Sequence, residues 1–172
     1  MIDIYYTYET VKSDDFILAV LAKYYNIRVD GLMKSVNGKP FILGRKVHFN
    51  LTHSKKMTAL AVGKVKLGLD CESLDGKPRP AVLQRFSERE KAEISALSEF
   101  YAHWTARESF IKYNGESLAH CWRKVEYLGG GIVFCGEKQD VKITQFVFDN
   151  YVFSLCCSDT KYALHEVKNL LQ

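Results

Sequence analysis

The chain has 172 residues, of which 47% are hydrophobic and 26% are charged, and its formal net charge is +4. These proportions are typical of a globular domain and exclude a disordered chain or a collagen-like fibre. No apolar run reaches the roughly 20 residues of a membrane-spanning helix, so we expect no membrane segment.

Charge and cysteine content bear on partners and compartment. Residues 1–68 hold 11 Lys/Arg and 5 Asp/Glu, whereas residues 69–172 hold 13 and 15. The basic first part suits a phosphate-bearing ligand, and an unevenly charged solvated surface is the ordinary alternative. The five cysteines form no CxxC pair or zinc-type cluster, and the chain starts without a secretion-signal pattern. The sequence therefore predicts a cytoplasmic protein with reduced thiols.

The first part of the chain alternates strand and helix patterns. Residues 2–8 are aromatic and β-branched and predict a strand, and apolar residues at helical spacing predict a helix over 14–25. Three further strands are predicted over 47–51, 57–63 and 65–72.

The second part begins with helices and ends with strands. A short helix is predicted over 79–86, and a second begins at Ser87, which forms a capping box with Glu90. A longer helix is predicted over 98–113, with Gly115 as its C-terminal stop. The remaining predicted strands cover residues 124–128, 132–135, 141–148 and 151–157.

Helices between groups of antiparallel strands predict an α+β fold. Segments 36–40 and 74–80 contain both Gly and Pro and are the predicted joints. The triple glycine at 129–131 lies between two strands and has no following Lys-Ser/Thr. We therefore interpret it as a hairpin turn and not as a phosphate-binding loop.

Asp70 and Glu72 are two apart on a predicted strand, so their carboxylates point to the same face. Two adjacent like charges repel, and a divalent cation with a preference for oxygen ligands, such as Mg²⁺, resolves that conflict. Two solvated acids at the end of a strand are the ordinary alternative, because the Asp-x-Glu pattern is common.

Glu108 and Lys112 are four apart on the predicted long helix and share one face, together with Trp104. They suit a reaction centre, but a surface ion pair beside a core tryptophan explains the same spacing. His53 follows a strand, between the hydroxyls of Thr52 and Ser54. These hydroxyls suit a phosphate, and a hydrogen-bonded structural histidine is the alternative.

Taken in series, these motifs resemble the 4′-phosphopantetheinyl transferase family, and in particular its longer, monomeric, surfactin-synthetase-activating class. The resemblance covers about residues 36–118. It rests on five blocks in order, namely Gly-Lys-Pro (38–40), Phe-Asn-Leu-Thr-His-Ser (49–54), Gly-Leu-Asp-Cys-Glu (68–72), Arg-Phe-Ser-x-x-Glu (85–90) and Trp-Thr-x-x-Glu-Ser-x-x-Lys (104–112).

The resemblance implies two related α+β halves with antiparallel sheets, residues 1–68 and 69–172, and an active site in the cleft between them. It implies a monomer that transfers the phosphopantetheine arm of coenzyme A to a serine of an acyl, peptidyl or polyketide carrier protein. The reaction needs Mg²⁺, with Mn²⁺ as the alternative metal, and releases 3′,5′-ADP. No nucleic-acid or membrane partner is expected.

The resemblance also assigns roles to individual residues. Asp70, Glu72 and Glu108 would hold the metal, and Glu108 would be the base for the serine. Lys112 would contact the pyrophosphate and offset the charge that develops during transfer. The nucleotide end of coenzyme A would contact three residues of the first half, Lys39, Thr52 and His53.

The chain departs from the family pattern at several places, which include Thr52 for the commoner Ser and Cys71 for an aliphatic residue. Arg107 stands where Lys is usual, which keeps the charge. The first half is short, and the early basic residues that grip the 3′-phosphate have no clear match; Lys12 and Lys34 are the candidates. Two alternatives therefore stay open: a degenerate relative that binds coenzyme A or a carrier protein without catalysis, and a nucleic-acid binder that uses the basic half.

Overall fold

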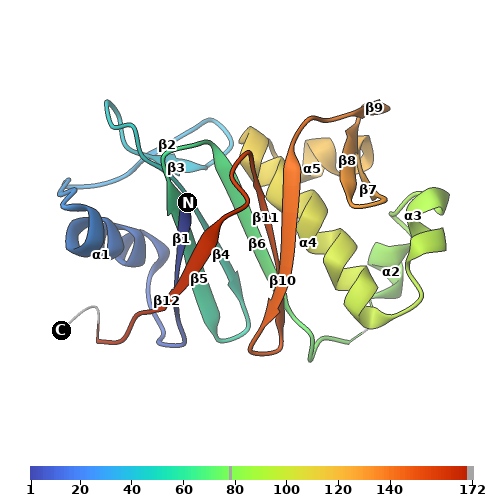
Figure 1. The fold of residues 1–172 in the computed structure, drawn as a ribbon, viewed down its shortest axis with the longest axis horizontal. Helices are drawn as coiled ribbons and strands as arrows, with labels where there is room; N and C mark the ends of the chain where they lie inside the picture. Colours follow the sequence, from blue (N-terminus) through green and yellow to red (C-terminus); the bar gives the residue numbers. More distant parts are fainter. Residues whose placement is uncertain (78, 170–172) are drawn as a thin grey trace.

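A computed structural model describes residues 1–77 and 79–169 of the chain. Its mixture of helices and sheets confirms the predicted α+β class. Figure 1 shows the two larger sheets in the middle, helix α1 (Ser13–Tyr25) at one end, and helices α2 (Pro80–Leu83), α3 (Glu88–Glu93) and α5 (Leu118–Cys121) with a small sheet at the other. Pro78, in the predicted joint 74–80, lies outside the described residues.

The first sheet has four strands in the order β12-β1-β5-β4. Helix α1 (Ser13–Tyr25) covers it through Phe16, Ile17, Val20 and Leu21, as its helical apolar spacing predicts. The helix ends at Asn26 in the left-handed conformation (φ 53°), which a short polar side chain tolerates. The four strands are β1 (Ile2–Thr7), β4 (His48–Ser54), β5 (Met57–Gly63) and β12 (Tyr162–Glu166).

The second sheet has three antiparallel strands in the order β10-β11-β6, namely β10 (Lys142–Phe148), β11 (Tyr151–Cys157) and β6 (Leu67–Ser73). All seven residues of β11 are buried because it is the central strand. Helix α4 (Leu97–Asn114) packs on β6 and β11 and ends at Gly115 (φ 72°). The predicted C-terminal stop at this glycine is confirmed.

Shorter elements surround these two sheets. The capping box between Ser87 and Glu90 is present at the start of α3, as predicted. The hairpin of β2 and β3 lies outside both large sheets and was not predicted. These elements are β2 (Met33–Lys34), β3 (Pro40–Phe41), α2 (Pro80–Leu83), α3 (Glu88–Glu93), α5 (Leu118–Cys121), the 3₁₀ turn η1 (Trp122–Lys124), β7 (Val125–Leu128), β8 (Gly131–Phe134) and β9 (Glu137–Lys138).

Strand β12 connects the end of the chain to its beginning. It was not predicted, and it pairs in parallel with β1, from Ile2–Tyr162 to Tyr6–Glu166. The boundary between residues 68 and 69 stays a prediction. The pairing shows that the sheet of the first half also contains a strand from the C-terminal part of the chain. In the part of the chain that the structure describes, no helix is long and apolar enough to cross a membrane.

Candidate active site

Four of the predicted site residues come together between strand β6 and helix α4. Asp70 and Glu72 lie on β6, and Glu108 and Lys112 lie on the facing side of α4. Lys112 Nζ lies 2.6 Å from Asp70 Oδ1, and the charges of Asp70 and Glu72 both act on Glu108. The structure therefore gathers the metal and catalytic candidates into one cluster.

Gly68 explains why β6 and α4 lie so close together. A Cβ atom at this position would collide with the backbone of Ser109 and Tyr113 in α4. Only glycine allows the two backbones to approach this closely. Gly68 lies two residues before Asp70, on the same face of the strand. The glycine of the Gly-Leu-Asp-Cys-Glu block thus sets the distance between the carboxylates of the strand and those of the helix.

On its other side, β6 faces β4 through a ladder of side-chain hydrogen bonds. Three polar side chains of β4, two residues apart, accept hydrogen bonds from backbone N–H groups of β6. The bonds run from Leu69 N to Asn50 Oδ1 (2.8 Å), from Cys71 N to Thr52 Oγ1 (3.2 Å) and from Ser73 N to Ser54 Oγ (3.1 Å). The ladder satisfies the open edge of β6 and connects the two large sheets directly beside the site.

Asp70 is 5% exposed in its side chain and is held by two donors. Its Oδ1 accepts hydrogen bonds from Lys112 Nζ (2.6 Å) and from Thr52 Oγ1 (3.0 Å). Its Oδ2 is buried and has no hydrogen-bond partner within residues 1–77 and 79–169. A buried carboxylate oxygen without a partner is costly, so this atom is suited to a ligand that brings positive charge.

Glu72 lies at the more open end of the cluster. Ser54 Oγ donates to its Oε2 (2.8 Å), and Arg79 Nη1 lies 3.5 Å from its Oε1. The Arg79 guanidinium also lies 5.7 Å from the ring centroids of both Tyr101 and Trp104. Arg79 is therefore a second cation of the site, besides Lys112, and its side chain is 43% exposed.

Glu108 is half-buried on α4. The pKa of its carboxyl is raised to about 8, first by burial and then by the charges of Asp70 and Glu72, against the opposing charges of Lys112 and Arg79. For Lys112, burial lowers the pKa, but the charges of Asp70 and Glu108 outweigh burial and raise it. The cluster therefore combines a carboxyl that is readily protonated with a lysine that stays charged.

The fit of these residues to a divalent metal follows from their oxygens. Asp70, Glu72 and Glu108 offer hard carboxylate ligands, and Oδ2 of Asp70 is buried without a hydrogen-bond partner among the described residues. In the described ranges, no three His, Cys, Asp or Glu side chains already have the spacing of a metal site. The donor set fits a hard divalent metal whose remaining ligands would come from outside the chain.

Lys39 reaches the site from the β2–β3 hairpin. Its Nζ donates to Lys112 O (2.6 Å) and to Leu67 O (3.2 Å), so it holds the last turn of α4 and the start of β6 together. Burial lowers the pKa of Lys39 to about 8, and the nearby charges of Lys66 and Lys112 act in the same direction. An anion in contact with Lys39 would stabilise its charged form.

A cavity of about 310 Å³ lies beside Lys39, between α1, the β2–β3 hairpin, β4 and the end of α4. Three lysines line it, Lys34, Lys39 and Lys112, together with Ser13 and Asn37. Of the two candidates for a 3′-phosphate contact, Lys34 lines this cavity and pairs with Asp14 at 3.6 Å, whereas Lys12 forms the N-cap of α1.

Thr52 and His53 point to opposite faces of β4. The Thr52 side chain is buried and its hydroxyl is bonded to Asp70, whereas His53 is exposed. His53 is not among the residues that line the cavity, whereas its β4 neighbours Asn50 and Leu51 are. The family resemblance assigned both residues to the nucleotide, whereas the period of the strand separates their side chains.

Sequence reasoning missed Arg79 and the contacts of Ser54 with Glu72 and Ser73. The signal for Ser54 is the alternation Asn50-x-Thr52-x-Ser54, which predicts three polar side chains on one face of a strand. No comparable signal marks Arg79, because its approach to Glu72 depends on the course of the segment after β6.

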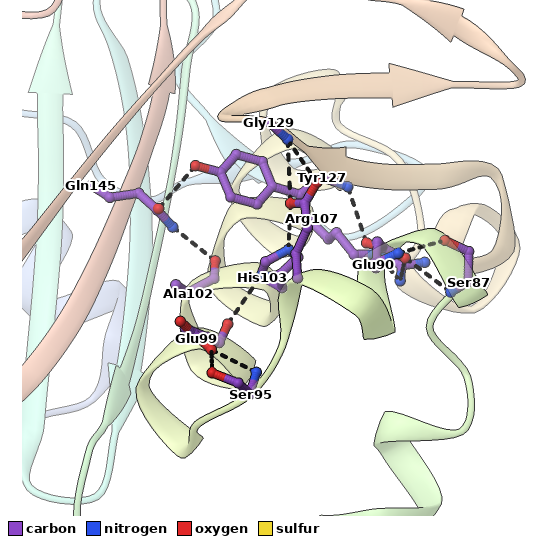
Figure 2. Close-up of polar contacts among 11 residues, drawn as sticks. Ser87, Glu90, Ser95, Glu99, Ala102, His103, Arg107, Tyr127, Gly129 and Gln145 are labelled. Atoms are coloured by element: carbon purple, nitrogen blue, oxygen red, sulfur yellow. Dashed lines mark hydrogen bonds and ion pairs between the residues drawn. The ribbon is translucent and has the colours of Figure 1, made fainter.

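Arg107 belongs to a buried network and not to the metal cluster (Figure 2). Its side chain is 1% exposed, and its Nη1 lies 3.0 Å from Glu90 Oε2, which also accepts a hydrogen bond from Ser87 N. Glu90 Oε1 accepts from Tyr127 N (3.0 Å), and the guanidinium lies 3.9 Å from the Trp122 ring centroid. This network fixes α4 to α3 and β7, behind the face that carries Glu108.

A model of the 4′-phosphopantetheinyl transferase superfamily matches residues 66–156, which is more than half of the chain. The chain is 29% identical over 119 residues to the 4′-phosphopantetheinyl transferase gsp of Aneurinibacillus migulanus, covering 64% of this chain and 50% of the relative. It is 30% identical over 121 residues to a 4′-phosphopantetheinyl transferase of Bacillus subtilis, covering 65% and 54%.

A third relative, the 4′-phosphopantetheinyl transferase Sfp of Bacillus subtilis (strain 168), is 26% identical over 121 residues, covering 65% of this chain and 54% of the relative. The chain thus spans about half the length of the curated relatives it matches. The matched region contains Asp70, Glu72, Glu108 and Lys112, and the family resemblance of the motifs is confirmed. The chain belongs to the 4′-phosphopantetheinyl transferase superfamily.

Proposed function

We propose that this protein transfers the 4′-phosphopantetheine arm of coenzyme A to a serine of an acyl, peptidyl or polyketide carrier protein. The observation that carries the proposal is the buried cluster in which Lys112 neutralises one oxygen of Asp70 while the other oxygen bonds to no described residue. Phosphoryl transfer depends mainly on positioning and on electrostatic stabilisation, and such a cluster supplies both.

Asp70, Glu72 and Glu108 would hold Mg²⁺, or Mn²⁺ in its place. When bound, the metal would supply Lewis-acid stabilisation and a template for the phosphates. Lys112 lies against Asp70 at the same site, so it suits contact with the pyrophosphate and compensation of the charge that builds up as the leaving group departs.

Glu108 is the base that we assign to the reaction. The carrier serine oxygen forms a bond to the β-phosphorus of coenzyme A, the bond from this phosphorus to the bridging oxygen breaks, and 3′,5′-ADP leaves with that electron pair. Glu108 takes the serine proton, directly or through one water. Its place on α4, close enough to Asp70, Glu72 and Lys112 for their charges to act on it, supports this role.

The nucleotide end of coenzyme A would lie along the cavity lined by Lys34, Lys39 and Lys112. Lys39 and His53 are the proposed contacts, and Lys34 is the proposed partner of the 3′-phosphate because it faces the same space. The resemblance also places Thr52 in this group, but its buried hydroxyl is bonded to Asp70 on the other face of β4, so we assign it no contact with the nucleotide.

We further infer a cytoplasmic monomer with no nucleic-acid or membrane partner. All five cysteines are free thiols, which supports a reducing compartment. The modest net charge of +4 gives little support to nucleic-acid binding.

The test is an intact-mass measurement of several apo carrier proteins after incubation with the protein, coenzyme A and Mg²⁺. The expected result is a gain of one phosphopantetheine on at least one carrier, lost with Asp70→Ala and retained with Glu88→Ala. The control removes an exposed carboxylate of α3 that pairs only with Lys91 among the described residues. No gain on any carrier would overturn the proposal.

The second candidate is a relative that binds coenzyme A without transfer. The short segment between β1 and β4, which holds one helix and one small hairpin, favours it because few residues remain to enclose the nucleotide. Titration calorimetry separates the two candidates: coenzyme A binding without any mass gain on the carriers would select the second.

A further inference from the structure

Two hydroxyl groups of β4 each connect the backbone of β6 to one of its carboxylates. Thr52 Oγ1 accepts a hydrogen bond from Cys71 N (3.2 Å) and donates one to Asp70 Oδ1 (3.0 Å). The hydroxyl therefore touches the carboxylate of one residue and the amide of the next. Its burial, at 2% exposure, keeps water from replacing either bond.

Ser54 repeats this unit two residues later. Its Oγ accepts from Ser73 N (3.1 Å) and donates to Glu72 Oε2 (2.8 Å). The hydroxyl residue of β4 and the amide that it binds in β6 are separated by the same number of residues in both units, because the two strands run side by side in one register. Two proposed metal ligands thus receive the same kind of support from the same strand.

The amide contact determines where each hydroxyl proton points. A hydroxyl carries one proton and two lone pairs, and a backbone N–H can only donate. Once the amide occupies a lone pair of Thr52, the proton is directed to Asp70, and the same holds for Ser54 and Glu72. A hydrogen bond to an ionised carboxylate is short and strong, so each carboxylate loses rotational freedom.

We propose that Thr52 and Ser54 are positioning residues that fix Asp70 and Glu72 in their metal-binding orientation. They act through these carboxylates, and the inference rests on the metal site of the proposed function. Because Oδ1 of Asp70 takes both Thr52 and Lys112, its Oδ2 is turned to the unpartnered position that a cation would fill. Strand β4 of the first half thereby shapes a metal site whose ligands all lie in the second half.

Asn50 provides a matched control. It makes the same kind of bond one step earlier in the ladder, from Leu69 N to its Oδ1 (2.8 Å), but the residue paired with that step is Gly68 and not an acid. Loss of the Asn50 side chain removes a buried bond between the sheets and leaves both carboxylate contacts in place. Asn50 also borders the cavity, so the comparison uses metal binding without coenzyme A.

The test is Mn²⁺ binding to the full chain, followed by electron paramagnetic resonance of the free ion, for wild type, Thr52→Val, Thr52→Ser, Ser54→Ala, Asn50→Ala and Asp70→Asn. Thermal unfolding of each variant records stability separately. Loss of a group that orients a metal ligand weakens metal binding by about 10- to 100-fold, which we expect for Thr52→Val and Ser54→Ala. Thr52→Ser keeps the hydroxyl and should therefore bind Mn²⁺ as tightly as the wild type. Asn50→Ala should have a lower melting temperature and an unchanged affinity for Mn²⁺.

Each outcome bears on a separate claim. Wild-type Mn²⁺ affinity in Thr52→Val and Ser54→Ala, together with weaker binding by Asp70→Asn, would overturn the positioning role and leave the proposed function standing. Equal weakening in Asn50→Ala would also overturn it, because general loosening between the sheets would then explain the effect. Absence of Mn²⁺ binding by the wild type would overturn the metal site and this inference with it.

Discussion

Lys112 Nζ lies 2.6 Å from Asp70 Oδ1 and 3.3 Å from Leu69 O, so one side chain of α4 is bonded to both the backbone and the acid of β6. The carbonyl of the same lysine accepts a hydrogen bond from Lys39. Helix, strand and hairpin therefore meet at Lys112, and the residue serves both the geometry and the charge balance of the cluster.

Replacement of Lys112 by Met should lower the rate of phosphopantetheine transfer by about 100- to 1,000-fold, because a charge aimed at the leaving group is lost. Lys91→Met, which removes a lysine paired with the exposed Glu88, is the matched control and should keep the wild-type rate. The rate of carrier modification under saturating coenzyme A measures both. A Lys112→Met variant as fast as the control would exclude the assigned role.

Gly68→Ala should destabilise the protein by about 1–3 kcal/mol, since the added methyl group collides with the α4 backbone at Ser109 and Tyr113. Gly131→Ala is the control, because the atoms nearest to a Cβ there are at the ordinary contact distance of 3.8 Å. Urea unfolding of both variants gives the free energies. Equal stability of the two would mean that β6 and α4 are not in the close contact described.

Arg107→Met should cost about 3–5 kcal/mol of stability, because it leaves the fully buried Glu90 without its cation. Arg123→Met, at an exposed position of the same half, should change stability by less than about 0.5 kcal/mol. Chemical unfolding monitored by tryptophan fluorescence is the measurement. A small effect at Arg107 would contradict the structural role of the network in Figure 2.

Coenzyme A binding should take up protons near pH 8. Burial lowers the pKa of Lys39 to about 8, so about half of this side chain is uncharged at that pH, and a bound phosphate favours the charged form. Binding should therefore weaken as pH rises above 8. Calorimetry in buffers with different ionisation enthalpies should give about 0.5 proton taken up at pH 8, and less for Lys39→Met. Equal uptake by both proteins would exclude Lys39 as the phosphate contact.

Much of the fold could be predicted from local patterns. Helix α1, strand β5 and the stop at Gly115 follow from apolar spacing and from terminal glycine chemistry, which are local properties. Strand β12 was missed because its place is determined by parallel pairing with β1, at the other end of the chain. A contact of that kind leaves little trace in the sequence around residue 162.

The candidate site, too, has features that local patterns predict and features that depend on distant contacts. Strand period and helix period place Asp70 with Glu72 and Glu108 with Lys112, and the family motifs join the two pairs. The contacts between elements could not be predicted, because the bonds from Thr52 to Asp70 and from Arg79 to Glu72 depend on how β4 and the segment after β6 pack. Arg107 was interpreted as a charge next to the site, and the structure shows it buried against Glu90.

The most direct test of the central claim is the single-turnover rate of phosphopantetheine transfer by Glu108→Gln, measured beside its affinity for coenzyme A. The account predicts a rate at least about 100-fold below the wild type, because both a metal ligand and the base are lost. Coenzyme A affinity in the absence of metal should stay within about 2-fold, because Glu108 contacts no part of the nucleotide in the proposed arrangement. A wild-type rate in this variant would contradict the assignment of the cluster as the reaction centre.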